Sequence, residues 1–428
     1  MKKSILFSAF ATGMVLLSAC SSDNDVVNGG GSESAVQQFV LQVANTGDGL
    51  QTRAGRPLES SEAKQDIDKV KIIVCENATN EVKYVTTINN WNTNEVSSVY
   101  TGSTHGRQKT ILIPNAERLD PGTYTVYAFG YSSTSEYDAD DLKKITDVAK
   151  SATFLSNVKL GTTNSIKGEE IFAGSKEITV TADKGFNQSV VLNRQVAGTF
   201  GYFDKIPYVA GATTLQLVAA NRNKSLVLGG FNSFDLTGNG AGNDVNVKYV
   251  VNGADAAADG EKVIYSISLS DWFYAVKDDN LDGLIDSEET NWKGEKTKYA
   301  VGSVFGGTFL IPFEKSTTST ETFVLQLTNG TDVLKSWTVK LPNTDGQLTA
   351  NYSLSKWNGS GFAAENVTDD AKVYNVVRNH LYGIGNRTLD TPVTPGTDPD
   401  KPEPLNKKQE LTLRVNDNWE VIHQMEVE

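Results

Sequence analysis

Apolar and polar side chains alternate along most of this chain, in short runs that end at Gly, Asn or Asp residues. An alternation with a period of two predicts β-strands that bury one face. Residues 139–154 differ, because Leu142, Ile145 and Val148 recur there at helical spacing. The many short strands predict an all-β protein made of β-sandwiches, with the boundary between two of them near residue 195. The predicted strands span residues 39–43, 70–74, 82–88, 109–113, 123–129, 177–181, 189–192, 197–203, 214–219, 263–269, 308–312, 322–327, 335–341 and 371–377.

The chain ends in a proline-rich segment followed by two predicted strands. Residues 391–404 combine Pro with Thr, Asp and Gly, a composition that favours an extended, semi-rigid linker. Two strands alone are marginally stable in water. We therefore expect them to pack on this chain's own body or on another molecule. The first strand is 411–415, and the second, 419–427, places on alternate positions Trp419, Val421, His423, Met425 and Val427.

The first predicted strand and the tail share one pattern. Residues 38–45 and 410–417 both read polar, apolar, any residue, Leu, polar, Val, and both end at a turn. The apolar positions of the first segment would fill the same three pockets as those of the second. Coincidence is the alternative, because short alternating strands are common. The matched sets are Phe39, Leu41 and Val43 in the first segment and Leu411, Leu413 and Val415 in the second.

The N-terminus has the features of a bacterial lipoprotein signal. Lys2 and Lys3 precede an apolar segment, residues 4–17, that is too short to span a bilayer. Small residues then lead to Cys20, which predicts removal of residues 1–19 and a lipid on the Cys20 thiol. An ordinary secretory peptide with a chance Cys is the alternative. The acidic stretch 21–25 resembles the surface-export signal of some Gram-negative lipoproteins.

A predicted processing site lies between the first strand and the body. Residues 51–57 are polar and contain Gly, which favours an exposed, cleavable segment. The bond between Arg53 and Ala54 suits an Arg-specific protease, whereas Arg56 precedes Pro57. A cut there would release residues 20–53 as a lipidated propeptide, including the first strand. The body would keep an open strand edge, and the tail of a neighbouring copy has the right shape to fill it.

Five segments stand out together. They are, in chain order, Leu17-Ser18-Ala19-Cys20, Arg53-Ala54-Gly55, residues 190–197 (VVLNRQVA), residues 374–382 (YNVVRNHLY), and the Pro-rich arm with the tail 419–427. Together they resemble the type V pilins, the FimA/Mfa-type fimbrillins of Gram-negative anaerobes. The resemblance covers nearly the whole chain, and the Pro-rich arm and tail are most similar to those of Mfa-type shaft subunits.

The resemblance implies two transthyretin-like β-sandwich domains, at residues 54–195 and 196–390, followed by a donor-strand arm at 391–428. It also implies cleavage after an Arg and polymerisation through the C-terminal strands. We therefore expect a shaft subunit of a surface fimbria with a role in adhesion. Its partners would be copies of itself, other fimbrial subunits and an Arg-specific protease. The precursor would be lipid-anchored at the outer membrane.

The net charge and the residue motifs argue against some functions and leave others open. A net charge of −13 disfavours binding to nucleic acid. We recognise no catalytic constellation, so we expect no enzyme; Arg378 reads as a structural hydrogen-bond donor, and Cys75 as a buried strand residue.

The main rival is an anchored glycan-binding β-sandwich lipoprotein in which an exposed Trp such as Trp91 or Trp357 forms a sugar platform. A fimbrial tip or minor subunit is a second alternative.

Residues 278–289 fit the full pattern of an EF-hand calcium loop, although the flanking segments give little helix. Gly283 permits the sharp turn, and oxygen atoms recur at the spacing of the calcium ligands. We therefore predict a structural Ca²⁺ site inserted in the second domain, with a solvated acidic turn as the alternative. The predicted ligands are Asp278, Asn280, Asp282, Asp286, Glu289 and the carbonyl of Leu284.

Overall fold

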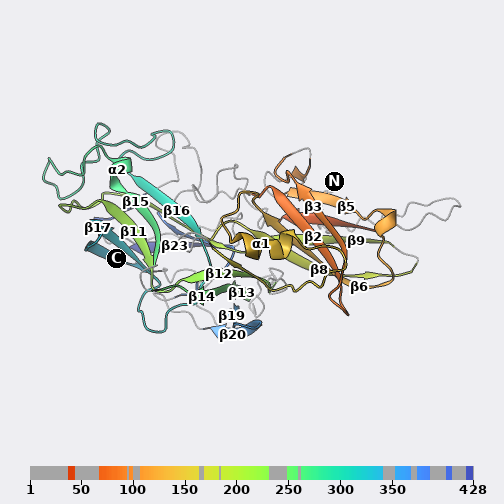
Figure 1. Cartoon of the computed structure of the whole chain (residues 1–428). Helices are drawn as coiled ribbons and strands as arrows, with labels where there is room; N and C mark the ends of the chain where they lie inside the picture. The colour runs from red at the N-terminus through yellow and green to blue at the C-terminus, as the bar shows by residue number, and fades with distance from the viewer. Residues whose placement is uncertain are drawn as a thin grey trace, which may run out of the picture.

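The computed structural model describes residues 37–43, 67–93, 96–99, 107–162, 168–182, 185–230, 248–258, 262–340, 352–367, 374–385, 402–406 and 421–427. These residues form two β-sandwiches side by side, with two small sheets near their junction (Figure 1). The predicted all-β sandwich fold is confirmed. The helices of the described residues are short, and none is long and apolar enough to cross a membrane. They are η1 (Asn115–Glu117), α1 (Ala139–Thr146) and α2 (Leu269–Trp272).

The first sandwich is one eight-stranded sheet folded into two facing layers. The layers are joined where β8 meets β9 through two residue pairs, Phe172 with Arg194 and Ala173 with Asn193. Apolar side chains of both layers share one core, which holds Ile72 from one side and Leu41 from the other. The strands, in sheet order, are β3 (Val82–Asn89), β2 (Lys69–Glu76), β6 (Gly122–Tyr131), β8 (Phe172–Val180), β9 (Phe186–Arg194), β1 (Gln37–Val43), β5 (Arg107–Leu112) and β4 (Ser98–Val99).

The second sandwich has two layers of the same kind. Its core contains Leu215 and Leu325 from one layer and Phe203 and Ile384 from the other. The first layer is β15 (Val263–Ser268), β11 (Thr214–Ala219), β17 (Phe323–Thr328) and β18 (Val333–Lys340). The second is β23 (Val421–Val427), β21 (His380–Ile384), β10 (Ala197–Asp204) and β16 (Val304–Leu310), with β22 (Glu403–Pro404) also paired to β10.

The two sandwiches repeat one seven-strand pattern. In each, the first strand lies between an antiparallel and a parallel neighbour: β1 between β5 and β9, β10 between β16 and β21. The opposite layers also correspond, since β3-β2-β6-β8 and β15-β11-β17-β18 are both antiparallel throughout. The proposed boundary near residue 195 falls between these repeats. Among the described strands, β23 is an addition, inserted where β8 and β9 meet directly in the first sandwich.

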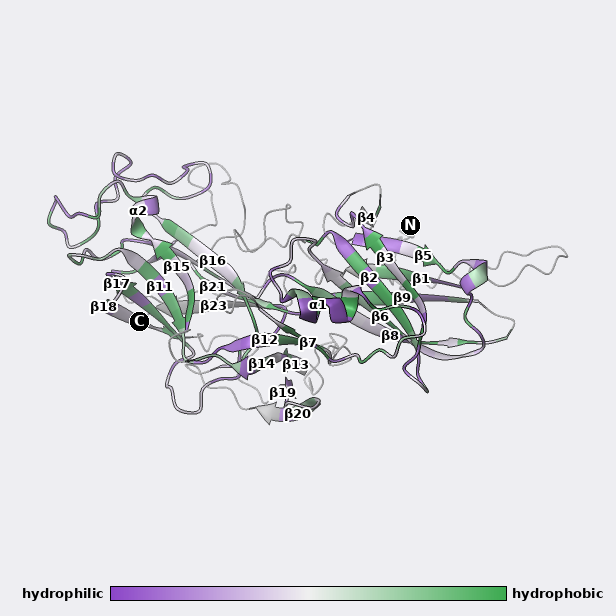
Figure 2. Ribbon diagram, in the orientation of Figure 1, coloured by the Kyte–Doolittle hydropathy of each residue, from purple (hydrophilic) through white to green (hydrophobic). Residues whose placement is uncertain are grey.

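Two small sheets flank the junction. β7 (Val158–Gly161), from the first half of the chain, pairs with β12 (Asn223–Leu228), which pairs in turn with β14 (Gly253–Ala256). β13 (Lys248–Val251), β19 (Tyr352–Trp357) and β20 (Phe362–Val367) form the other sheet. β12 begins with polar residues and ends with apolar ones (NKSLVL), and Figure 2 shows α1 as largely hydrophilic. Leu160 and Leu226 share a core cluster with Ile73 of the first sandwich, so an apolar core bridges the two halves.

Two predicted elements are corrected. The helix predicted over 139–154 ends at Thr146, because Ser151 has a φ of 66° and Val82 on β3 hydrogen-bonds to this segment at both Ser151 and Ala152. The strand predicted over 371–377 is also misplaced. The last body strand, β21, begins at His380, directly after Asn379, which has a φ of 58°.

Candidate functional site

Strand β1 occupies an interior position of its layer. It pairs antiparallel with β5, where Phe39 faces Ile111, and parallel with β9, where Leu41 faces Val190. The side chains of Phe39 and Leu41 are fully buried in the core of the first sandwich. Their predicted place on the buried face of a strand agrees with this arrangement. Val43 is the last residue of β1, but its side chain lies outside the described residues.

The start of β1 is held by a reciprocal pair of hydrogen bonds. The buried amide Nε2 of Gln37 donates to the carbonyl of Leu119 at 2.9 Å, and the backbone N–H of Leu119 donates to Oε1 of Gln37 at 2.8 Å. The N–H of Ile113 also donates to the carbonyl of Gln37, at 3.0 Å. The hydrogen bonds with Leu119 and Ile113 therefore fix the register of β1, in addition to the alternation of its apolar and polar side chains.

Removal of β1 would be costly for the first sandwich. Burial of Phe39 and Leu41 contributes about 3–6 kcal/mol, at roughly 1.5–3 kcal/mol for each side chain. Backbone groups of β5 and β9 would also lose their partners. Because a folded domain is stable by only about 5–15 kcal/mol, the emptied slot would strongly favour another strand. The predicted lipidation and cleavage residues, Cys20, Arg53 and Ala54, lie outside the described residues.

The end of the tail pairs with this chain's own second sandwich. Strand β23 runs parallel to β21, from His380 opposite Val421 to Ile384 opposite Met425. It also meets β18, where Val339 lies opposite Val427. The backbone of the predicted donor residues Val421, Met425 and Val427 thus lies in a sheet. The other predicted donor residues, Leu411, Leu413, Val415 and Trp419, are not among the described residues.

The proline-rich linker is anchored before it reaches the tail. Strand β22 pairs with β10, with Glu403 opposite Phe203, and the side chain of Leu405 is buried in the core of the second sandwich. The N–H of Leu405 donates to the carbonyl of Asp204 at 3.1 Å. This anchor was not predicted, although an isolated Leu directly after the Pro-rich run is a signal for it.

The two motifs on either side of the domain junction meet in one buried polar network. Arg378 donates from Nη1 to Oε1 of Gln195 at 2.9 Å and to the carbonyl of Gly229 at 2.8 Å, and from Nη2 to the carbonyl of Gly230 at 2.9 Å. Arg194 lies 2.7 Å from the carboxylate of Glu170, and both side chains are buried. The predicted hydrogen-bonding role of Arg378 is thereby confirmed.

Further hydrogen bonds cross the same junction. Arg194 donates from Nη1 to Oδ1 of Asn379 at 3.1 Å, and the N–H of Asn379 donates to the carbonyl of Val196 at 2.8 Å. Asn252 donates from Nδ2 to the carbonyl of Gln195 at 3.0 Å. Polar groups buried in this way are stable only while they stay paired. Together with the bridging apolar core, they link the two sandwiches through buried contacts.

The acidic loop predicted to bind calcium forms a tight turn. The carboxylate of Asp278 accepts from the N–H groups of Asp282 at 3.1 Å and Gly283 at 3.0 Å, and Asn280 donates to Asp282 at 3.2 Å. Asp286 is buried and accepts from the N–H of Asp279, and Glu289 forms an ion pair with Lys296.

The loop therefore fits the predicted ion only in part. Within the described residues, no three carboxylate, imidazole or thiol groups converge as they would around a metal ion. Asp278, Asn280 and Asp282 share one turn, and their oxygen atoms are of the type that Ca²⁺ prefers. Glu289 would have to exchange Lys296 for the ion. The carbonyl of Leu284 would complete the predicted set, and the calcium assignment remains a prediction.

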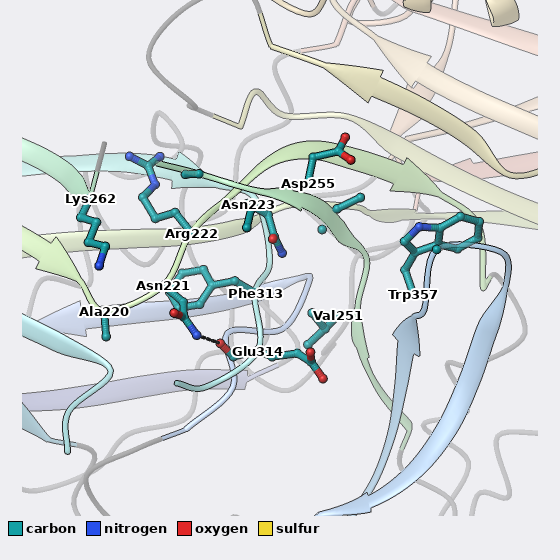
Figure 3. A pocket seen from close by; sticks show the side chains of 15 residues that line it. Ala220, Asn221, Arg222, Asn223, Val251, Asp255, Lys262, Phe313, Glu314 and Trp357 are labelled. Atoms are coloured by element: carbon teal, nitrogen blue, oxygen red, sulfur yellow. Dashed lines mark hydrogen bonds between the residues drawn. The ribbon is translucent and has the colours of Figure 1, made fainter. Parts of the chain in front are cut away.

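The two tryptophans considered as sugar platforms differ in exposure. Trp91 is fully buried in the first core, so this residue was wrongly considered exposed: its position at the turn after β3 places the indole between the layers. Trp357 is half-buried and lines a cavity of about 430 Å³ beside the small sheets (Figure 3).

Comparison with known proteins returned neither a matching family model nor a matching curated protein. Solved structures of fimbrial proteins do match. Against the fimbrilin FimA of Porphyromonas gingivalis, the identity is 14%, the TM-score is 0.35, and the match covers 85% of this chain and 94% of that one.

Two further matches come from the same organism. The fimbrial anchor protein Mfa2 gives 8% identity and a TM-score of 0.34 over 80% of this chain and 100% of that one. The tip fimbrial protein Mfa3 gives 8% identity and a TM-score of 0.34 over 79% of this chain and 99% of that one.

Proposed function

We propose that this protein is a structural shaft subunit of a surface fimbria, polymerised by exchange of β-strands between copies. The observation that carries the proposal is an imbalance of strands. Without β1 the first sandwich lacks one strand of its seven-strand pattern, whereas without β23 the second sandwich still has all seven. After loss of β1 the first sandwich would need a strand, whereas the second sandwich holds β23 in addition to its seven.

In this proposal, lipid on Cys20 delivers the precursor to the outer membrane, and an Arg-specific protease cuts between Arg53 and Ala54. Loss of β1 opens the slot between β5 and β9. The segment 411–415 of a neighbouring copy then fills it, with Leu411 and Leu413 replacing Phe39 and Leu41. Because contacts of this kind need not close on themselves, they favour a filament.

The tail would first have to leave its own sandwich. Residues 411–415 lie between β22, which ends at Pro404, and β23, which begins at Val421. While both of these strands stay paired, the segment is held at its own subunit. The proposal therefore requires β23 to separate from β21 and β18, while Leu405 keeps the base of the arm attached.

An in vitro polymerisation assay tests this proposal. The full chain carrying Cys20→Ala, which prevents lipidation, is treated with an Arg-specific protease and examined by electron microscopy and size-exclusion chromatography. We expect rods after cleavage, and monomers from an Arg53→Gln variant that keeps β1. A second control ends at Asn406, so that Leu405 stays in the core while the tail is absent, and it should remain monomeric after cleavage.

Monomers from the cleaved full chain, or rods from the chain that ends at Asn406, would contradict strand exchange through the tail. Either result would favour an anchored monomeric protein or a tip or minor subunit of a fimbria instead.

A further inference from the structure

A cavity beside the junction has the chemistry of a sugar-binding site. It is lined by the turn after β11, by β14, by the segment after β16 and by the end of β19. Figure 3 shows Trp357 at one end and Lys262 and Arg222 at the other, with Asn221 and Glu314 between them. Its volume of about 430 Å³ lies within the range of roughly 300–1,000 Å³ that is usual for small-molecule sites.

Hydrogen-bonding groups on the cavity wall are left for a ligand. Asn221 donates from Nδ2 to the carbonyl of Glu314 at 3.1 Å, and Asn223 donates from Nδ2 to that of Pro312 at 2.9 Å. Within the described part of the chain, the Oδ1 atoms of both amides accept no hydrogen bond and the indole N–H of Trp357 donates none. The cavity thus offers one indole donor and two amide acceptors, and each amide is held in place by its own hydrogen bond to the backbone.

Backbone segments around the cavity lie very close to one another at Gly253. A Cβ atom on Gly253 would lie 1.9 Å from the carbonyl oxygen of Pro312 and 2.4 Å from Nδ2 of Asn223, so only glycine fits there. Asp255 has a φ of 58°, a conformation that Asp tolerates better than most residues. Its carboxylate accepts from Nζ of Lys159 at 2.9 Å.

We propose that this cavity binds a neutral pyranose, with one face of the ring against the indole of Trp357 and its hydroxyl groups on Asn221, Asn223 and the carboxylates. The C–H face of a sugar is apolar and slightly positive, which suits the negative face of an indole. Because Asp255 pairs with Lys159 and Glu314 with Lys356, the charges beside Trp357 are balanced within the protein, which favours a neutral ligand. The polar wall disfavours an apolar one. If the protein forms a shaft, each subunit would present one such cavity, and repeated weak sites would act together.

Saturation-transfer NMR on the full chain tests the proposal with methyl mannoside, methyl galactoside and methyl glucuronide at about 5 mM, a concentration suited to millimolar affinity. We expect transfer to at least one neutral glycoside and weaker transfer to the charged glucuronide. Trp357→Ala should weaken binding about tenfold or more because the stacking face is lost. Trp272→Ala, a half-buried Trp that packs on Tyr299 instead, is the matched control and should bind unchanged.

Trp357 also packs against Phe362, with 5.4 Å between ring centroids, so Trp357→Ala would also remove a contact between β19 and β20. A second variant therefore leaves these two strands unchanged. The double change Asp255→Asn and Glu314→Gln keeps shape and removes both charged acceptors, and should also weaken binding about tenfold. Transfer that persists in both variants, preference for the glucuronide, or no transfer to any of the three glycosides overturns the proposal. These readouts do not depend on polymerisation, so they are separate from the test of the shaft function.

Discussion

Arg378 and Gln195 are 183 residues apart in the chain, yet Nη1 of Arg378 donates a hydrogen bond of 2.9 Å to Oε1 of Gln195 at the junction of the two sandwiches. The Arg378 side chain is almost fully buried, and it also donates to the carbonyls of Gly229 and Gly230. One guanidinium group therefore ties three segments together, so its replacement tests how much the junction contributes to stability.

Replacing Arg378 should destabilise the protein strongly. Arg378→Ala leaves three acceptors at the junction without their donor, and we expect the free energy of unfolding to fall by about 3 kcal/mol or more, at roughly 1–3 kcal/mol for each buried group. Arg378→Lys should cost less, because an ammonium group still donates but lacks the planar fork. Urea unfolding monitored by tryptophan fluorescence measures both.

The exposed Lys150 provides the control, and Lys150→Ala should change stability by less than about 0.5 kcal/mol. If Arg378→Ala unfolds at the same urea concentration as the unaltered chain, the hydrogen bonds at the junction are not what stabilises it.

A substitution at Phe39 should act only before processing. Phe39→Ala opens a cavity in the first core and should destabilise the uncut chain by about 3–5 kcal/mol. After cleavage at Arg53 and release of β1, the same substitution should have no effect on the stability or assembly of the remaining chain. Scanning calorimetry before and after cleavage compares the two states, and Arg53→Gln keeps the defect permanently. Equal destabilisation before and after cleavage would show that β1 stays in place.

Local patterns were sufficient to predict most strands. The alternation around Phe39 and Leu41 matches their burial in β1, because period two leaves few other arrangements. The helix over 139–154 was overestimated, since Ala152 satisfies its backbone through β3, a partner about 70 residues earlier in the chain that helical spacing does not reveal.

The remaining features depend on pairing between distant segments. Nothing near Val421 in the sequence indicates that β21 is its neighbour, and a strand beyond a linker has several possible edges to join. The cavity at Trp357 is equally non-local, because Asn221 and Glu314 reach it from separate turns. Burial of Trp91 was not predicted for the same reason, because its exposure depends on segments that are distant in the sequence.

The buried thiol of Cys75 predicts a pH dependence. Burial raises the pKa of Cys75 from 9.0 to about 12. Between these values the unfolded thiol loses its proton while the folded one keeps it, so the free energy of unfolding falls as pH rises. This residue should account for a loss of about 1 kcal/mol between pH ~9 and ~10. A Cys75→Ala variant should lack that contribution, which isolates it from the titration of Tyr and Lys.

Thiol labelling checks the same residue independently. Iodoacetamide at pH ~8 should modify Cys75 only in urea, because the thiolate is the reactive form and is disfavoured in the folded core. Rapid labelling of the native protein, or identical pH profiles for Cys75→Ala and the unaltered chain, would contradict the buried, protonated thiol.

Calcium should stabilise the second sandwich if the loop 278–289 binds it. The buried side chain of Ile285 anchors this loop in the core, and its N–H donates to the carbonyl of Ile206 at 2.9 Å. At a Ca²⁺ concentration 100 times the Kd, the expected gain is about 2.7 kcal/mol. Calorimetry in Ca²⁺ and in a chelator measures it, and Asp282→Asn should weaken the response.

Lys296 supplies a sharper form of this test. Because it pairs with Glu289, it competes with the ion for that carboxylate. An exposed ion pair is worth roughly 0.2–1 kcal/mol, so Lys296→Gln should tighten Ca²⁺ binding about 1.4- to 5-fold. Lys298→Gln, which removes a neighbouring pair with Glu295 outside the loop, is the matched control and should leave affinity unchanged. Identical transitions with and without Ca²⁺ would identify the segment as a solvated acidic turn.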